Sequence, residues 1–390
     1  MSGNQRIYLD YNATAPLLPQ ARAAMIDALD RVGNASSVHA EGRNARKLVE
    51  HARSKLASLL DCEARQVTFT SGATEAAHHV LSPHLRASGH DIHVSQLYVG
   101  ATEHPCVLAG GCFNAGRITV LPVDGNGMID LEGLDRTLAA HDRTKGAAMI
   151  AVQLANNETG AIQPLYRISA IVHGHNAFLV VDAVQGLGKM PLTLAATGAD
   201  FAFFSAHKIG GPQGVGALVA ANAGVMPLPL LRGGGQENFQ RAGTENVAAI
   251  AGFAAALENL PSQADLVRIG IIRDSIEAQL RTISLEAGNK VGEPVVFAKG
   301  AERLVNTSCF SLPGIRAETA LIALDLAGFA LSSGSACSSG KVRKSHVLDA
   351  MGIEDNLARS ALRLSIGRQT SELHAGQFLS AWKEMVKRLA

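Results

Sequence analysis

Three short polar segments of this chain carry residues that suit the chemistry of an amine with an aldehyde. Ser71–Glu75, Asp182 and Lys208 each come directly after a short apolar run that predicts a buried strand. In open α/β sheets, ligands bind in the crevice outside the carboxyl ends of the strands. We therefore expect the three segments to lie together at one edge of a sheet.

Each segment has a chemical property of its own. Ser71–Glu75 reads SGATE, and its glycine permits a tight turn into a helix whose free N–H groups form a general anion site. A carboxylate such as Asp182 at the end of a buried strand is costly unless it is paired. Lys208, between an apolar strand and a glycine turn, is easily desolvated, and desolvation lowers the pKa of its amine and makes it a nucleophile. Taken singly, these residues are more often an ordinary turn, a helix N-cap and a solvated loop lysine.

The combination is more specific than its parts. A cofactor with an aldehyde, a phosphate and a pyridine ring needs a lysine for a Schiff base, an acid for the ring nitrogen and an anion cradle. Pyridoxal 5'-phosphate (PLP) imposes this set, and the chain offers all three in the order cradle, acid, lysine. His104 adds an imidazole that could stack on the ring, although a lone histidine in such a loop is more often structural.

One cysteine has a setting unlike the others. Cys337 lies in the serine- and glycine-rich segment Ser332–Gly340, which predicts a mobile loop, and Lys341, Arg343 and Lys344 nearby favour a thiolate. By itself such a cysteine is most often a free surface thiol. The remaining cysteines stand in apolar contexts and are interpreted as small buried hydrophobic residues: Cys62, Cys106, Cys112 and Cys309.

Short apolar runs alternate with helical periods, which predicts an α/β fold with a mostly parallel central sheet flanked by helices. We expect strands at 67–70, 118–123, 147–152, 177–181, 200–204 and 215–220, and helices at 43–60, 104–115, 130–141 and 164–174. Further on we expect a helix at 262–283, a strand at 304–312, a helix at 317–327, a strand at 361–366 and a last helix from 371. The change of pattern suggests a large domain at 16–255 and a smaller α+β domain formed by 1–15 and 256–390, which carries the Cys337 loop.

Composition excludes several classes of protein. Of 390 residues, 47% are hydrophobic and 18% are charged, which excludes a disordered chain. The net charge of +1 and the lack of a basic stripe argue against nucleic-acid binding. No apolar stretch reaches the ~20 residues that a membrane span needs. The first residues show no signal pattern, so we expect a cytoplasmic protein.

The cysteines and histidines do not suggest a metal site. The five cysteines form no CxxC pair, which argues against a disulfide framework and a structural zinc site. His78 and His79 are adjacent in a predicted helix, so their side chains point about 100° apart and make a poor chelate. We expect no metal in this protein.

The joint order of the motifs resembles the NifS/IscS-type cysteine desulfurases, within the class V aminotransferase group of PLP enzymes of fold type I. The resemblance covers almost the whole chain. It rests on Tyr8–Thr14 (YLDYNAT), Ser71–Glu75 (SGATE), Thr102–His104 (TEH), Asn156–Gly160 (NNETG), Asp182–Gln185 (DAVQ), Ser205–Lys208 (SAHK), Arg241–Asn246 (RAGTEN) and Ser332–Cys337 (SSGSAC).

The resemblance implies a role for each matching residue. Lys208 would hold PLP through a Schiff base, and Asp182 would keep the ring nitrogen protonated. Gln185 would bond the ring hydroxyl oxygen, and His104 would stack on the ring as a catalytic residue. The phosphate and the substrate carboxylate would be bound by a larger set: Ala73, Thr74, Ser205 and His207 at the phosphate, Thr244 from the partner subunit of a homodimer, and Asn157 and Arg363 at the carboxylate.

The resemblance also implies a reaction and a partner. Cys337 would attack the sulfur of L-cysteine and hold it as a persulfide, leaving L-alanine. Transamination and decarboxylation need no such thiol. The extended Cys337 loop is similar to that of the desulfurases that pass sulfur directly to a docked scaffold, for iron–sulfur cluster assembly or another thio-cofactor pathway.

The sequence departs from the family pattern in places. Asn238 stands where an arginine is common, which puts PLP affinity or dimer packing in question, and Lys344 replaces a common proline. Two alternatives stay open. One is a selenocysteine lyase or cysteine sulfinate desulfinase, whose leaving groups depart without a thiol nucleophile. The other is a catalytically lapsed PLP-fold protein that serves as a docking partner.

Overall fold

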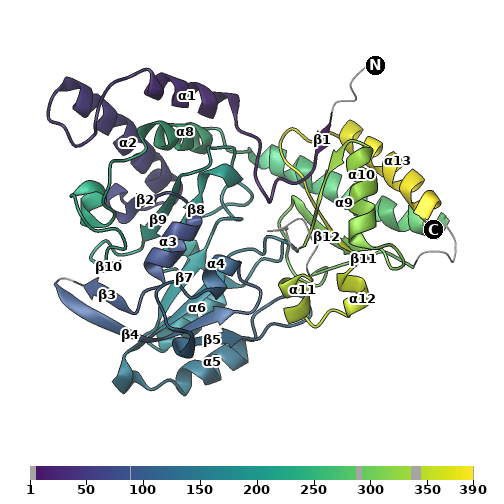
Figure 1. The fold of residues 1–390 in the computed structure, drawn as a ribbon. Helices are drawn as coiled ribbons and strands as arrows, with labels where there is room; N and C mark the ends of the chain where they lie inside the picture. Colours follow the sequence, from purple (N-terminus) through teal and green to yellow (C-terminus); the bar gives the residue numbers. More distant parts are fainter. Residues whose placement is uncertain (1–5, 88, 287–291, 335–343, 390) are drawn as a thin grey trace.

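The computed structural model describes residues 6–87, 89–286, 292–334 and 344–389, and Figure 1 shows them as a larger and a smaller part side by side. The strands of the larger part are β2 (Val67–Thr70), β3 (His84–Ala87), β4 (His90–Gly100), β5 (Ile118–Leu121), β6 (Ala147–Gln153), β7 (Phe178–Asp182), β8 (Phe201–Ser205), β9 (Gly216–Ala220) and β10 (Val225–Pro227). Its helices are α1 (Pro19–Leu29), α2 (Ala40–Leu59), α3 (Ala73–Val80), α4 (Pro105–Leu108), α5 (Leu131–Ala139), α6 (Leu165–Gly174), α7 (Leu194–Thr197) and α8 (Val247–Glu258).

The central sheet has the order β10-β3-β4-β6-β7-β8-β9-β2, with β5 beside β4. Strands β4, β6, β7 and β8 pair in parallel, whereas β3 and β9 run antiparallel to their neighbours. Because β9 is antiparallel to both β8 and β2, β2 runs in the same direction as β8. The carboxyl ends of β2, β6, β7 and β8 therefore open on one edge of the sheet.

Both faces of the sheet are covered by helices, as a parallel sheet requires. Side chains of β6 alternate between two cores: Ile150 and Val152 pack with α2, α5, α6 and α8, whereas Met149 and Ala151 pack with α3 and α4. This double burial explains why the strand reads as a continuous apolar run in the sequence.

The smaller part contains a sheet of order β11-β12-β15-β14 and a parallel pair β1-β13. Its strands are β1 (Ile7–Tyr8), β11 (Val295–Val296), β12 (Thr307–Ser311), β13 (Phe329–Ala330), β14 (Ser332–Ser333) and β15 (Ala361–Ser365). Its helices are α9 (Gln263–Glu286), α10 (Ala317–Leu326), α11 (His346–Ala350), α12 (Asp355–Ala358) and α13 (Glu372–Leu389). Leu9 packs in the same core as Trp382, so the first strand joins the end of the chain.

The hydrophobic cores bear on the proposed division of the chain. Phe253 and Leu257 of α8 pack in the core of the larger part, and Ile269 of α9 packs in that of the smaller part. The proposed boundary at residue 255 falls inside α8, and a boundary between Glu258 and Gln263 keeps each helix with its own core. The two-domain division stays a proposal.

Most of the expected elements are present, and one helix was predicted wrongly. The interval 104–115 holds only the short α4, which ends at Leu108. Gly110 and Gly111 follow with φ values of 75° and 56°, a left-handed backbone that ends a helix.

Candidate active site

A cavity of about 520 Å³ opens where β2, β6, β7 and β8 end. It brings together most of the residues that the sequence predicted for a PLP site: Ala73, Thr74, His104, Asn157, Asp182, Gln185, Ser205, His207, Lys208 and Arg363. Two predicted residues are not among them. Thr244 lines a neighbouring cavity, and Cys337 lies outside the described residues.

Lys208 follows β8 and lies on the floor of the cavity. Its Nζ donates hydrogen bonds to the backbone oxygens of Asn12 (2.7 Å) and Ala13 (2.8 Å). Burial, together with the positive charge of Arg363, lowers the pKa of the Lys208 amine to about 8, although Asp182 and Asp10 oppose the change. A lysine in this state supplies the neutral amine that attacks an aldehyde.

Asp182 ends β7 and is buried. Its Oδ1 accepts a hydrogen bond from the backbone N–H of Val184 (3.0 Å). Burial raises the pKa of its carboxyl to about 6, against the effects of the Val184 bond and of Lys208. A cationic partner inside the cavity would restore the carboxylate, which is what the ring nitrogen of PLP offers.

Helix α3 begins where the sequence predicts an anion cradle. The N-cap residue Gly72 contributes no side-chain hydrogen bond, so the backbone N–H groups of Ala73 and Thr74 have no intrahelical acceptor. Ser205 and His207 line the same cavity. Burial, with Lys208 and Lys189, lowers the pKa of the His207 imidazole to about 4, so His207 is a neutral hydrogen-bonding group.

His104 precedes α4, and its side chain caps that helix. Nδ1 accepts a hydrogen bond from the backbone N–H of Cys106 (3.2 Å). Burial, with Lys208 and His346, lowers the pKa of the imidazole. The neutral ring therefore carries its proton on Nε2.

The interpretation of the other cysteines was correct only for Cys309, which is buried. Cys62 and Cys106 are partly exposed, and Cys112 is exposed. Cys106 lines the cavity itself, with its Sγ 3.0 Å from Nδ1 of His104. The apolar sequence around Cys106 did not reveal this, because it gives no sign of which face of the short α4 borders the cavity.

Arg363 reaches the cavity from β15 of the smaller part. Its Nη1 donates to the backbone oxygen of Asn157 (3.1 Å) and its Nη2 to Oδ1 of Asp10 (2.7 Å). Among the described residues, no group accepts a hydrogen bond from its buried Nε. Arg363 lines the cavity, and its guanidinium suits a substrate carboxylate, because guanidinium groups bind carboxylates with directed N–H bonds.

Sequence reasoning missed Asn12, which connects several of these residues. Its backbone oxygen accepts bonds from Lys208 and Gln185, and its side chain binds Asn157 and Thr307. Asn12 lies within the YLDYNAT motif on which the family resemblance rests. The motif therefore marked this residue, but the sequence assigned no role to its side chain.

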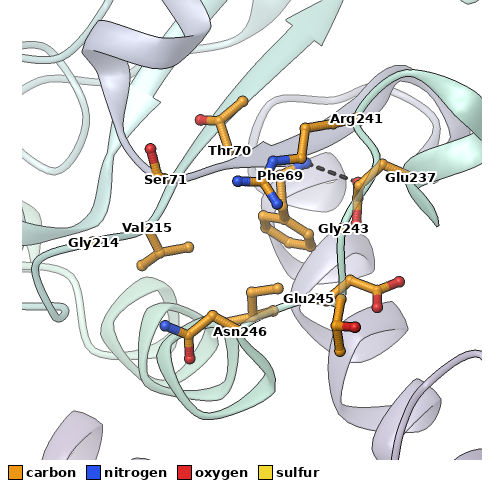
Figure 2. A pocket seen from close by; sticks show the side chains of 12 residues that line it. Phe69, Thr70, Ser71, Gly214, Val215, Glu237, Arg241, Gly243, Glu245 and Asn246 are labelled. Atoms are coloured by element: carbon orange, nitrogen blue, oxygen red, sulfur yellow. Dashed lines mark hydrogen bonds between the residues drawn. The ribbon is translucent and has the colours of Figure 1, made fainter. Parts of the chain in front are cut away.

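Thr244 lines a second cavity of about 200 Å³ next to the first, and Ser71 and Gly214 belong to both. Figure 2 shows Ser71 on one side of this cavity and Asn246 on the other. In the described chain Thr244 therefore lines this second cavity and not the one that contains Lys208 and Asp182.

A strained turn borders this second cavity. Glu237, Asn238 and Phe239 all have positive φ, between 47° and 64°, which is uncommon for residues other than glycine. Glu237 is held by Arg53 (2.8 Å) and by the backbone N–H of Phe69 (2.8 Å), the bond drawn in Figure 2. The lining of neither cavity includes Asn238.

The histidine pair, possible metal ligands and possible membrane helices can each be examined in the described residues. His79 is buried and His78 is exposed, so the pair does point apart. Within residues 6–87, 89–286, 292–334 and 344–389, no three His, Cys, Asp or Glu side chains converge as a metal would need. Across the same residues, no helix combines the length and apolar character that crossing a bilayer takes.

The fold and the cavity define a PLP enzyme of the class V aminotransferases, and the comparisons agree. Residues 7–374 match the model of the Aminotransferase class-V family, and the chain belongs to this family. PLP is the cofactor of the family.

The full-length relatives are more specific. The chain is 36% identical to a cysteine desulfurase of Cereibacter sphaeroides, over 99% of this chain and 97% of that one. It is 34% identical to the cysteine desulfurase IscS of Dictyoglomus turgidum, over 99% and 95%. The solved NifS-like protein of Rickettsia africae matches with a TM-score of 0.84 and 31% identity, over 98% and 99%. These findings confirm the resemblance and the fold type drawn from the sequence.

The residues of the cavity fit PLP. An acid, an amine of lowered pKa and a helix start with free N–H groups stand around one space, and each is a group that the ring nitrogen, the aldehyde or the phosphate requires. Gly72 leaves the cradle open, because a Cβ built on it would meet no atom within 4 Å.

Proposed function

We propose that this protein is a PLP-dependent cysteine desulfurase, which converts L-cysteine to L-alanine and holds the sulfur as a persulfide on Cys337. The observation that carries the proposal is the cavity, which joins Lys208, Asp182 and the α3 cradle to Arg363 in a chain whose full-length relatives are cysteine desulfurases.

PLP, when bound, supplies an electron sink for the bond changes at the α-carbon of the amino acid. The chain supplies the groups around it. Lys208 would provide the amine, Asp182 would balance the charge of the ring nitrogen, and the N–H groups of α3 would hold the phosphate. Ser205 and His207 would complete the phosphate site, and Gln185 would bond the ring oxygen.

The substrate is held by its carboxylate. Arg363 and Asn157 both line the cavity, and Nη1 of Arg363 is bonded to the backbone oxygen of Asn157. His104 carries its proton on Nε2 and is positioned to give it up or receive it during the reaction. These groups would hold the amino acid in the cavity by its carboxylate.

The electrons in the sulfur-transfer step balance without an added oxidant. The thiolate of Cys337 attacks the substrate sulfur, a new S–S bond forms, and the carbon–sulfur bond breaks with its electron pair left on carbon. Protonation of that carbon gives L-alanine. The persulfide then passes its outer sulfur to an acceptor, for which we propose an iron–sulfur scaffold or another thio-cofactor protein.

The remaining proposals concern the cellular setting. We propose a homodimer, because Thr244 lines a cavity beside its own cofactor site rather than the site itself. We propose a cytoplasmic enzyme that meets its acceptor there, with no role in nucleic-acid or membrane binding.

One assay tests the proposal. Purified protein with PLP, L-cysteine and a thiol reductant is expected to release alanine and sulfide in equal amounts. Both products should vanish in Lys208→Ala and in Cys337→Ala, while Cys337→Ala keeps its bound cofactor. Full sulfide release by Cys337→Ala would refute the persulfide step, and activity of that variant on selenocysteine alone would favour a lyase. A protein that binds no PLP would remove the assignment altogether.

A further inference from the structure

Lys189 is a buried lysine that the proposed reaction does not use. It lies in the turn that follows β7, four residues after Gln185, and only 8% of it is exposed. Such a residue is rarely buried without a partner that explains its position. No carboxylate is recorded as its partner among the described residues, so an ion pair does not provide the explanation.

The hydrogen bonds around Lys189 have a fixed direction. The backbone oxygen of Asn12 can only accept, so the amide group of Gln185 that meets it at 3.1 Å must be Nε2. The Oε1 atom of Gln185 therefore faces Lys189 and accepts a hydrogen bond from its Nζ.

The side chain of Asn12 is fixed in the same way. Its Nδ2 donates to the backbone oxygen of Asn157 (3.1 Å), which can only accept, so Oδ1 is left to face Lys189 at 2.9 Å. Asn306 also donates to this Oδ1, at 3.1 Å. The Lys189 amine thus donates to two amide oxygens, Oδ1 of Asn12 and Oε1 of Gln185.

The charges around Lys189 suit this arrangement. Burial and then the positive charges of Lys208 and Arg363 lower the pKa of its amine well below the usual value. In either protonation state the amine keeps at least two N–H groups, which is enough for both amide oxygens.

We propose that Lys189 is a positioning residue: it occupies Oε1 of Gln185 while the backbone oxygen of Asn12 takes one N–H of Nε2, so that the second N–H of Nε2 is the group that Gln185 offers to the cofactor cavity as a hydrogen-bond donor. The inference rests on the proposed function, since it concerns the PLP site. Without Lys189, Oε1 of Gln185 would lose a buried partner, and only the Nε2 bond to Asn12 would still hold the amide, so its second N–H would no longer be fixed toward the cofactor.

The test is a spectroscopic pH titration of the PLP-loaded protein, which needs no substrate. A hydrogen bond to the negative form of the ring oxygen favours that form. Loss of the donor in Lys189→Met should therefore raise the pH midpoint of the cofactor's absorbance change by about one unit, which corresponds to one ordinary hydrogen bond.

A matched control separates Gln185 from Asn12. Asn306→Ala removes the other donor to Oδ1 of Asn12 but does not touch Gln185, so its midpoint should stay that of the unaltered protein. A double-mutant cycle completes the test. In a Gln185→Leu background, Lys189→Met should add no further shift, because its effect passes through the missing amide.

The outcomes are distinct. An equal shift with and without Gln185, a shift in Asn306→Ala as large as in Lys189→Met, or no shift in a loaded Lys189→Met protein would each overturn the inference. If Lys189→Met does not fold, Lys189→Gln replaces it in the same cycle, since it keeps an N–H donor and should give a smaller shift that again vanishes in Gln185→Leu. A wild-type protein without a titrating cofactor band would instead contradict the proposed function.

Discussion

At the residue scale, the burial of a few polar groups accounts for the chemistry of the cavity. Burial disfavours charge, so it moves the pKa of Lys208 down to about 8 and that of Asp182 up to about 6. The sequence predicted both residues, because a polar side chain directly after an apolar strand is visible in a single segment. Asn12 and Lys189 were missed because their contacts join segments far apart in the chain, and no local pattern reports such contacts.

The lowered pKa of Lys208 predicts how protein without cofactor takes up PLP. Only the neutral amine reacts, and with a pKa of about 8 roughly one molecule in ten is neutral at pH 7. The loading rate, followed by absorbance, should rise about tenfold from pH 7 and level off above pH 8–9. An ordinary lysine would give a rate that keeps rising to about pH 10, so a continued rise would contradict the assignment. Lys208→Ala should show no covalent loading at any pH.

At the element scale, periodicity predicted what is buried on two faces and failed where the backbone changes direction. Strands β6, β7 and β8 are apolar up to their last residue and were located within a residue or two. The first half of β4 is partly exposed and rich in histidine and polar residues, so its sequence does not read as a strand. Helix α8 is nearly apolar all round because it packs against both α1 and α2, which removes the amphipathic signal.

Two glycines in different elements make a matched test of backbone packing. At Gly216, in β9, a Cβ would meet the backbone oxygen of Phe204 at 2.5 Å and the backbone of Gly72 at 2.7 Å. Gly216→Ala should therefore destabilise the protein by about 1–3 kcal/mol and weaken PLP binding, because the strand pushes on the α3 cradle. At Gly376, in α13, a Cβ would meet no atom within 4 Å. Gly376→Ala should stabilise the protein by about 0.5–1 kcal/mol.

The measurements are the urea midpoint of unfolding and the PLP dissociation constant of both variants. Gly376→Ala lies far from the cavity and should bind PLP as the unaltered protein does. Unchanged PLP binding by Gly216→Ala would show that the cradle does not depend on the close approach of β9 to Gly72.

At the scale of the whole molecule, the cavity exists only because the two parts of the chain pack together. Lys208 and Asp182 come from the larger part, Arg363 comes from the smaller part, and Asp10 beside it comes from the start of the chain. Composition and periodicity could not show that these residues meet. The family resemblance supplied Arg363 and Asn157, and the structure places both in the cavity, but it left Thr244 in the neighbouring one.

The position of Thr244 leads to a prediction about subunits. If Thr244 serves the phosphate site of a partner, then Lys208→Ala and Thr244→Ala subunits complement each other. A hybrid dimer has one site that combines the intact Lys208 of the second subunit with the intact Thr244 of the first, and another site that carries both changes. Mixing the two inactive or weakened variants under exchange conditions should therefore restore up to one full site per hybrid dimer, measured as bound PLP and as alanine formed.

If Thr244 acts within its own chain, no intact site arises in the hybrid, and mixing restores nothing. Sedimentation of the mixed sample checks that hybrids have formed, so a lack of recovery in a confirmed hybrid would argue against a shared site.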